Sequence, residues 1–449
     1  MHRPVRPGTP LPFGSLMCLL FAAGCGGTGT EADPTDLPPP AVPGKADEAF
    51  SVQGARQWYL IGNDLTPSED RLELSVAAPA GTGLIDLWID GHYSGRTRPA
   101  DGQIAVEADI AGLAPGQHEA LLGADEKSPA IAQLHFFRSY PLYVFVTTDW
   151  DDPDNSDDKL TRQERLHERH SGLRITHFVG PYTFTDPSVP PERGALLAGW
   201  VKGMRDMYGD EIGLHIHPYC SFVETTAVPC RTSPSFGYAS GDDTGYTVYL
   251  SSYTEEEMAA LLARADEIFL ASGLGKPTSF RAGGWTVQIP TLKALARGGF
   301  LADTSANNWE RLEEWEGYPG ADLYDWNKEH WATIDETSQP YYPSEDDILS
   351  ASPPAVPILE VPDNGILVDY VTADEMIEMF HANWQEGGVL ERPTAYVTGY
   401  HPPNFSESYF DRVDTMLTRV DLFLHSSDAG PVIYATMSEA ARVWPPAPQ

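Results

Sequence analysis

The sequence predicts an α/β protein whose larger part is a distorted parallel (β/α)7-8 barrel of the TIM type, preceded by a small all-β domain. From residue 140 onward, short apolar runs alternate with amphipathic segments at helical spacing. Parallel strands need crossover helices of this kind, so the alternation predicts a parallel sheet covered by helices. An open doubly wound sheet is the alternative, but no glycine-rich phosphate loop follows the predicted strands.

The predicted strands and helices of the barrel lie between residues 140 and 444. The strand sequences are "LYVFVTT", "LRITHFVG", "EIGLHIH", "SFRAGG", "FLADTS", "ILEVP", "AYVTGYH" and "PVIYAT". The clearest helix covers residues 254–271, where Thr254 and Glu257 form a capping box before a run of apolar residues at helical spacing. Thr436 and Glu439 give a similar start signal for the last helix.

The N-terminus has the composition of an export signal. Residues 1–24 begin with basic residues, continue as an apolar segment and end in small residues, and "AAGC" resembles a bacterial lipobox. We therefore expect a lipoprotein signal peptide and lipidation of Cys25, with an ordinary signal peptide as the alternative. Residues 25–49 are rich in Gly, Pro, Thr and Asp and predict a flexible linker. The protein is then expected at the cell envelope, attached to the membrane by lipid alone.

Residues 50–138 predict a small β-sandwich. Short segments of alternating polarity, such as "RLELSV" and "QIAVEADI", are separated by Gly and Pro and have no long helical period. The phrase "GLAPGQHEALLGA" resembles a hairpin of immunoglobulin-like modules, which implies a spacer or carbohydrate-facing domain without chemistry of its own.

The charge of the chain excludes some partners. It has 29 basic and 65 acidic residues, a formal net charge of −36, which would repel nucleic acid and anionic membrane surfaces. No protein partner is implied. Cys220 and Cys230 remain after export and lie close in sequence, so we expect a disulfide in an oxidising compartment.

Polar side chains follow several predicted strands directly, and they are the candidate functional residues. They are Asp149 and Asp151 after the first strand, His215 and His217 after the third, Arg281 after the fourth, Asp303 after the fifth and His401 after the seventh. In parallel barrels the reactive groups come from the carboxyl ends of the strands. The sequence therefore predicts that these side chains share one site.

The motif "GLHIHP" indicates a metal centre. Residues two apart on a strand point to the same face, so His215 and His217 can bind one ion together. A carboxylate from another strand would complete a set that leaves positions open for water and substrate, and we choose Asp151, with Asp152 as the fallback. Zn²⁺ or another divalent transition metal fits such a set of two imidazoles and one carboxylate.

Two other metal enzymes use similar donors. Iron(II) oxygenases also bind their metal through two histidines and a carboxylate, but on β-sandwich barrels, which the strand–helix alternation argues against. Binuclear amidohydrolases place a His-x-His pair on the first barrel strand, whereas here an aspartate comes first and the histidine pair third.

The remaining aspartates of the run that begins at Asp149 are expected to have a structural role. A calcium loop of the EF-hand kind fits poorly, because Asp157 stands where glycine is needed and Gln163 where glutamate is needed. We expect Asp154, Asp157 and Asp158 in a solvated turn before a helix that starts near residue 160, where acids suit the helix N-terminus.

In this order, the motifs resemble those of the polysaccharide deacetylases, carbohydrate esterase family 4, over roughly residues 140–440. "TTDWDD" is similar to the first family motif, which implies that Asp149 is the catalytic base and Asp151 a metal ligand. "GLHIHP" is similar to a variant of the second motif, in which one residue separates the metal-binding histidines. The commoner form spaces them four apart, and position 213 is Gly here.

The other three motifs imply further roles. "FRAGGW" resembles the third motif, with Arg281 holding the base and Trp285 lining the substrate groove. "ADTSANNW" resembles the fourth and implies that Asp303 lies behind the catalytic histidine. "VTGYHPP" resembles the fifth and implies that His401 is the general acid.

Aromatic residues are frequent between "DTSAN" and "ILEVP", a segment without regular periodicity. A loop of this length in a compact domain is usually functional or packed over the fold. We expect Trp309 of this segment, together with Trp285 and Tyr400, to contact a polysaccharide. Packing of the rings against the barrel is the alternative.

The sequence thus predicts a metal-dependent hydrolase that removes N-acetyl groups from an extracellular or cell-wall polysaccharide, with a metal-activated water, an aspartate base and a histidine acid. A non-catalytic glycan-binding surface lipoprotein and another metal-dependent C–N hydrolase on the same barrel are the alternatives.

Overall fold

The structure is a computed structural model that describes residues 52–78, 83–123 and 132–446. The predicted signal peptide of residues 1–24, with lipidation at Cys25, and the whole predicted linker of residues 25–49 lie outside these residues, so they stay predictions. None of the helices in the described ranges combines the length and the apolar character needed to span a lipid bilayer.

The larger part of the chain is built on one curled parallel sheet, as predicted. Its strands are β9 Leu142–Asp149, β10 Ile175–Val179, β11 Glu211–Ile216, β12 Ser279–Ala282, β13 Ala302–Asp303, β14 Leu359–Glu360, β15 Thr394–Tyr400 and β16 Val432–Tyr434. The order is β14-β13-β12-β11-β10-β9-β15, and β16 also pairs with β9. Every pairing is parallel, so the carboxyl ends of the strands share one edge. This is the arrangement of a (β/α)7-8 barrel.

An irregular segment connects the two ends of the sheet. β14 covers only two residues, but the chain beyond it keeps main-chain hydrogen bonds to the strands on both sides. On one side, Val361 N donates to Asp303 O of β13 at 2.8 Å. On the other side, Gly365 N donates to Val397 O and Val368 N donates to Gly399 O of β15, each at 2.8 Å. Residues 361–368 therefore lie between β13 and β15, and they bring the following residues to the carboxyl edge of the sheet.

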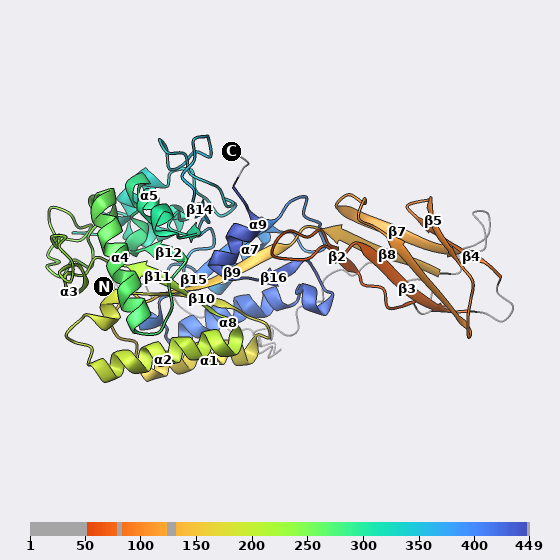
Figure 1. Cartoon of the computed structure of the whole chain (residues 1–449), viewed down its shortest axis with the longest axis horizontal. Helices are drawn as coiled ribbons and strands as arrows, with labels where there is room; N and C mark the ends of the chain where they lie inside the picture. The colour runs from red at the N-terminus through yellow and green to blue at the C-terminus, as the bar shows by residue number, and fades with distance from the viewer. Residues whose placement is uncertain (1–51, 79–82, 124–131, 447–449) are drawn as a thin grey trace, which may run out of the picture. The chain divides into compact units, whose positions relative to one another are not determined.

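The connections between strands are mostly helical. The longer helices are α1 Asp157–Arg169, α2 Pro191–Tyr208, α4 Glu255–Ala271, α5 Ile289–Gly298, α6 Leu323–His330, α7 Ala373–Asn383 and α8 Glu407–Asp421, and the short ones are α3 Cys220–Val223 and α9 Ala440–Val443. The 3-10 turns are η2 Pro181–Phe184, η3 Leu250–Ser252, η4 Gly283–Trp285, η5 Trp309–Trp315, η6 Pro402–Asn404, η7 His425–Ser427 and η8 Met437–Glu439. Helices α1, α2 and α8 lie side by side along one face of the sheet (Figure 1).

Local sequence signals set several of these boundaries. The predicted capping boxes are present at Thr254, which begins α4, and at Thr436, which begins η8, and Thr372 forms another before α7. α1 begins at Asp157, three residues before the predicted start near residue 160, so Asp157 and Asp158 belong to the first turn of the helix and not to a turn before it. Acids stabilise this position because the helix N-terminus carries a partial positive charge.

The N-terminal part of the described chain contains strands without helices. They are β1 Val52–Gln53, β2 Trp58–Leu60, β3 Arg71–Ala77, β4 Ile85–Ile89, β5 His92–Thr97, β6 Gln103–Asp109, β7 Gly116–Gly123 and β8 Ala132–Ser139. They form two sheets, β1-β3-β6 and β2-β8-β7-β4-β5, whose apolar residues share one core. The likeness to immunoglobulin-like modules and the domain boundary near residue 139 stay predictions.

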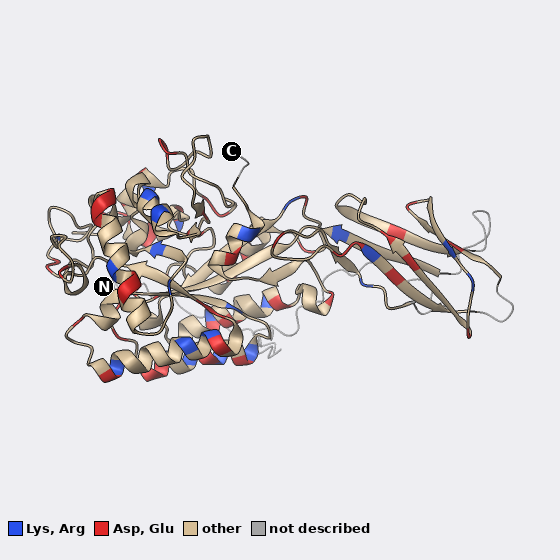
Figure 2. Cartoon of the chain, viewed as in Figure 1, with Lys and Arg blue, Asp and Glu red and all other residues tan. Residues whose placement is uncertain are grey.

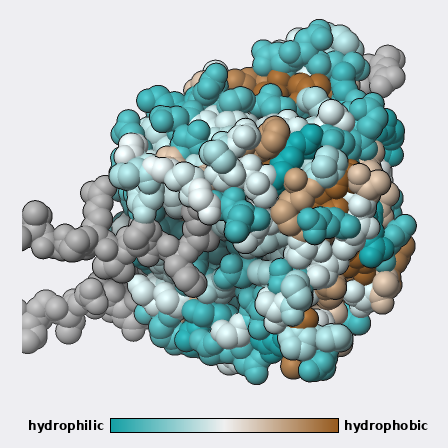
Figure 3. Space-filling view, turned by 90° about the vertical axis from the view of Figure 1, so that its left-hand side faces the viewer, coloured by the Kyte–Doolittle hydropathy of each residue, from teal (hydrophilic) through white to brown (hydrophobic). Residues whose placement is uncertain are grey.

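The charges of the chain are distributed over its surface. Figure 2 shows acidic and basic residues interspersed along α1, α2 and α8, without a block of a single sign. The face drawn in Figure 3 is mostly hydrophilic and carries separate apolar patches rather than one continuous apolar area.

Helix α1 ends against α8 at a buried charged group. The ring of His170 lies between two carboxylates, with Nδ1 2.8 Å from Asp421 Oδ2 and Nε2 3.1 Å from Asp414 Oδ1. Only the protonated ring can donate to both. Burial alone would lower the pKa of His170, but the hydrogen bonds and charges of Asp414 and Asp421 outweigh burial and raise it.

We predict that His170→Gln destabilises the fold in a pH-dependent way. Because the pKa of His170 is raised by folding, its stabilisation is complete below the unfolded pKa of about 6.5 and is lost as the pH rises through the folded pKa. Urea unfolding should show a loss of about 2 kcal/mol at pH 5.5 that shrinks at alkaline pH. His92→Gln, at an exposed position, is the control. A loss of the same size at every pH would contradict the charged-ring assignment.

Candidate functional site

Three predicted metal ligands meet at the carboxyl edge of the sheet. Asp151 follows β9, His215 lies at the end of β11 and His217 comes directly after that strand. The donor atoms of the three side chains all lie within 4.8 Å of one another. Nε2 of His215 is 3.1 Å and Nε2 of His217 is 3.4 Å from the same oxygen, Oδ1 of Asp151. We call these three residues the triad.

The other ring nitrogen of each histidine is fixed by the backbone. Nδ1 of His215 lies 2.9 Å from the carbonyl of Arg281, and Nδ1 of His217 lies 2.7 Å from the carbonyl of Tyr246. A carbonyl only accepts, so Nδ1 carries the proton, and Nε2 of a neutral ring presents a lone pair. Two such lone pairs aimed at a carboxylate repel it unless a cation lies between them.

The triad therefore fits a divalent transition metal. Metal-binding histidines typically donate their second N–H to a backbone carbonyl or carboxylate, as both do here. Burial lowers the pKa of His217, although Asp151 opposes this, and the neutral ring is the form that binds a metal. Gly283 leaves room for the ring, because a Cβ at that position would lie 2.4 Å from Nδ1 of His217.

Tyrosines hold the carboxylate of the triad. Tyr246 donates from its hydroxyl to Oδ2 of Asp151 at 2.7 Å, and its ring stacks on His217 with the centroids 4.2 Å apart. Tyr219 donates to the backbone carbonyl of Asp151 at 3.3 Å. Among the residues that the structure describes, Asp151 and not Asp152 belongs to the group of metal donors. Tyr246 lies in a loop with no recognisable motif, so the sequence did not indicate it as a site residue.

Arg281 lies beside Asp149, as predicted. Its Nη1 is 3.2 and 3.4 Å from the two carboxylate oxygens of Asp149, and both side chains are buried. The rest of the guanidinium is also satisfied, by Thr147 and by two atoms of Thr304. A buried charge with this many partners has one orientation, so Arg281 fixes the position of the Asp149 carboxylate.

A second carboxylate, Asp363, shares the same guanidinium. Its Oδ2 is 3.4 Å from Nη2 of Arg281 and accepts a hydrogen bond from Nε1 of Trp285 at 3.2 Å. Burial raises the pKa of Asp363 to about 6, an effect that Arg281 opposes and Asp149 reinforces. Asp363 comes from the irregular segment after β14, and no strand pattern could have indicated it.

His401 lies between the triad and another carboxylate. Nε2 of His401 is 3.6 Å from Oδ2 of Asp151, and Nδ1 is 2.9 Å from Oδ2 of Asp369. Burial would lower the pKa of His401, but the charges of Asp151 and Asp369 raise it to about 10. The ring is thus oriented by Asp369 with Nε2 toward the triad, which is the arrangement of a proton donor.

Asp303 was predicted to lie behind His401, and the structure corrects this prediction. The carboxylate beside His401 belongs to Asp369. Asp303 lies on β13 next to Glu360 of β14, and it accepts a hydrogen bond from Ser305 at 2.8 Å. Burial raises its pKa to about 6, although hydrogen bonds from its neighbours and the charge of Arg281 lower it. Residues 361–368 lie between β13 and β15, and Asp369, the residue directly after this segment, takes the place beside His401.

The three predicted substrate-contacting aromatics differ in position. Trp285 is buried, bonded to Asp363, and packs against Tyr370 at 5.9 Å, while Tyr370 in turn lies 6.3 Å from the His401 ring. Trp309 is half-buried and packs against a neighbouring tyrosine. Tyr400 is fully buried, with its ring stacked on Phe405, so the structure does not bring it to the site.

The predicted disulfide between Cys220 and Cys230 is present. It joins α3, which begins three residues after His217, to the start of the loop that carries Tyr246. The loop that supports the triad is therefore covalently tied to the end of the strand that supplies the histidines.

Comparison with known proteins gives matches in structure alone. No family model and no curated protein matches the sequence. A protein from Mycobacterium smegmatis assigned to the polysaccharide deacetylases matches at 17% identity and a TM-score of 0.39, over 67% of this chain and 89% of that one. A family 4 acetyl xylan esterase from Clostridium thermocellum, solved with a cobalt ion, matches at 12% identity and a TM-score of 0.32, over 67% and 90%.

A family 4 carbohydrate esterase pseudoenzyme from Bacillus anthracis also matches, at 9% identity and a TM-score of 0.32, over 66% of this chain and 63% of that one. The names of these proteins place them among the polysaccharide deacetylases or in carbohydrate esterase family 4, the family that the sequence motifs resemble.

We predict that Tyr246→Phe weakens metal binding about 10-fold to 100-fold, because the substitution removes the hydrogen bond that holds the carboxylate of Asp151. The phenylalanine ring can still stack on His217, so only the hydrogen bond is lost. Equilibrium dialysis against Zn²⁺ followed by elemental analysis measures this directly. His217→Ala should lose the ion altogether, and His135→Ala, in the N-terminal strands, should keep it. Unchanged Zn²⁺ affinity in both Tyr246→Phe and His217→Ala would show that the ion binds elsewhere.

Proposed function

We propose that the chain belongs to carbohydrate esterase family 4 and is a metal-dependent hydrolase that removes N-acetyl groups from an extracellular or cell-wall polysaccharide. One observation carries the proposal. Two groups of opposite function lie near the triad: Asp149, a carboxylate paired with Arg281, and His401, an imidazole whose Nε2 is 3.6 Å from Asp151 and which is oriented by Asp369. Hydrolysis of an amide needs a base for water, an acid for the leaving amine and a cation for the carbonyl oxygen.

The triad would hold the metal through Nε2 of His215, Nε2 of His217 and the carboxylate of Asp151. A bound Zn²⁺ or other divalent transition metal supplies Lewis-acid polarisation of the acetyl carbonyl and activation of the attacking water. This fits the donor set, which leaves coordination positions open for substrate and water.

The protein's own residues move the protons. Asp149 takes a proton from the attacking water, and its pairing with Arg281 keeps the carboxylate in place while it does so. His401 gives a proton from Nε2 to the leaving amine nitrogen, and Asp369 beside Nδ1 stabilises the charged ring before that step. Tyr370 and Trp285 form the wall next to His401 and limit the access of bulk water there.

We also propose that the protein is exported and held at the cell envelope by a lipid on Cys25. The support is the sequence of the first 25 residues together with the disulfide Cys220–Cys230, which suits an oxidising compartment. Contact with the membrane then comes from the lipid alone, and the substrate is a polysaccharide outside the cytoplasm.

Acetate release from N-acetylated oligosaccharides tests the proposed function. We expect release by the metal-loaded protein, loss of release with a chelator and recovery on adding Zn²⁺. Asp149→Asn and His401→Ala should each lower kcat by about 10² to 10⁴ because each removes one proton-transfer group.

The metal content of both variants is the control, since neither residue belongs to the triad. A variant that keeps wild-type turnover would contradict its assigned role. Bound metal without acetate release from any N-acetylated glycan would instead favour the non-catalytic glycan-binding protein.

A further inference from the structure

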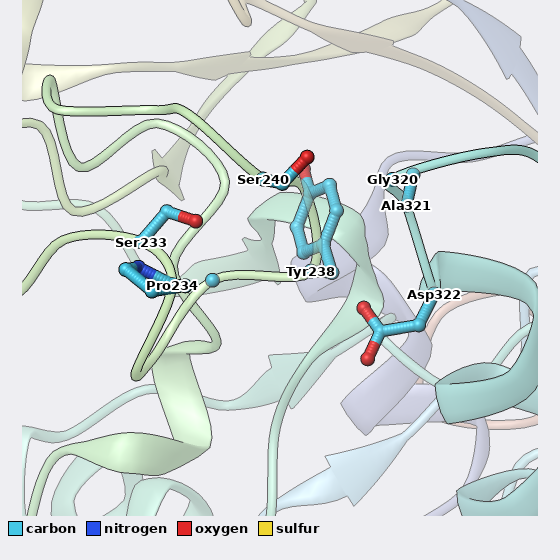
Figure 4. Close-up of a pocket in the computed structure, with 8 residues that line it drawn as sticks. Ser233, Pro234, Tyr238, Ser240, Gly320, Ala321 and Asp322 are labelled. Atoms are coloured by element: carbon cyan, nitrogen blue, oxygen red, sulfur yellow. The ribbon is translucent and has the colours of Figure 1, made fainter.

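A cavity lies between the loop of residues 233–249 and residues 320–322. It has a volume of about 320 Å³ (Figure 4). Main-chain hydrogen bonds hold its walls: Tyr238 N to Thr247 O at 2.9 Å, Ser240 N to Gly320 O at 2.7 Å and Asp322 N to Tyr238 O at 2.7 Å. The walls are therefore formed before any ligand binds, as is typical of small-molecule sites.

The cavity adjoins the metal centre through two neighbouring glycines. Tyr238, which lines the cavity, packs over Gly284, where an added Cβ would lie 3.0 Å from its ring. The preceding residue, Gly283, packs in the same way against the ring of His217. Consecutive Cα atoms are about 3.8 Å apart, so the rings of Tyr238 and His217 pack against adjacent positions of one short stretch of backbone. The loop that forms the cavity wall also supplies Tyr246 to the triad.

The lining of the cavity is polar and carries one charge. Ser233 and Ser240 contribute hydroxyls, Tyr238 contributes an aromatic ring, and Asp322 is the single charged residue among those that line it. Figure 4 shows the Ser233 hydroxyl and the Asp322 carboxylate directed from opposite sides toward the space beside the Tyr238 ring. Oδ1 of Asp322 accepts a hydrogen bond from Tyr249 at 2.6 Å, so the carboxylate is fixed and exposed to the cavity.

This chemistry selects against an anion and favours a hydroxylated, positively charged ligand. Hydroxyls and a tyrosine ring suit a sugar, and a carboxylate fixed by one hydrogen bond suits an ammonium group. Asp242 adds negative potential at the same wall, because its charge acts on Tyr238. A fully acetylated sugar has no cation to pair with Asp322, whereas a sugar that has lost its acetyl group carries one.

Resting on the proposed function, we propose that this cavity is a subsite for the sugar next to the one being deacetylated, and that Asp322 there binds the ammonium group of an already deacetylated amino sugar. The protein then prefers partly deacetylated chains, and each product unit assists the reaction at its neighbour. Asp322 is in this sense a specificity-determining residue.

The test compares two substrates in three proteins. The substrates are a fully acetylated N-acetylglucosamine tetramer and tetramers in which one unit is glucosamine. The wild type should have a kcat/KM about tenfold higher for the glucosamine-containing tetramers, the expected worth of one charged hydrogen bond. Asp322→Asn keeps an acceptor for Tyr249 but removes the charge, and it should abolish the preference. Glu329→Gln makes the same charge change at an exposed position of α6 and should retain it.

The outcomes separate the subsite from the proposed function. Acetate release with the same kcat/KM for both substrates in the wild type, or a preference that survives in Asp322→Asn, overturns the subsite and leaves the deacetylase intact. No release from either substrate by metal-loaded wild type overturns both. In the wild type, the ratio of kcat/KM for the glucosamine-containing tetramers to that for the fully acetylated tetramer should fall with increasing salt. In Asp322→Asn the same ratio should not change with salt, and this difference supports the pairing of charges.

Discussion

The hydrogen bonds from Nδ1 of His215 and His217 to backbone carbonyls determine the rest of the site. They fix the tautomer of each ring and turn both Nε2 atoms toward Asp151. The two carbonyls belong to different parts of the chain, one to β12 and one to the loop that carries Tyr246. The metal centre therefore forms only when the strand order of the barrel and the packing of that loop are both correct, and the disulfide next to α3 ties the loop to the strand.

Buried charges on both sides of the triad are compensated in pairs. Arg281 is shared by Asp149 and Asp363, and His401 is shared by Asp369 and Asp151. Burying an ion is costly unless it has a partner with good geometry, so these pairings fix each group in one orientation. A divalent cation would compensate the negative charge of Asp151, where this carboxylate and the two neutral imidazoles of the triad converge. The same pairings hold the Asp149 carboxylate and the His401 imidazole in the orientations that the proposed function requires.

The sequence predicted the parts of the site that follow regular strands. Alternation along a strand placed His215 and His217 on one face, and the shared carboxyl edge of parallel strands brought Asp151 and Arg281 to them. Asp363 and Asp369 were missed because they follow a two-residue strand and an irregular segment, where no periodicity exists to place them. Tyr246 was missed for the same reason. Tyr400 could have been excluded, because its neighbour His401 points into the site and adjacent residues of a strand point to opposite faces.

X-ray absorption spectroscopy at the metal edge of the zinc-loaded protein tests the triad most directly. The geometry predicts a first shell with two imidazole nitrogens and a carboxylate oxygen at about 2.0 to 2.2 Å, and open positions filled by water. Loss of one imidazole from that shell in His215→Ala, with the ion still detectable, would match the arrangement. A first shell that contains no imidazole, or that is unchanged in both His215→Ala and His217→Ala, would contradict it.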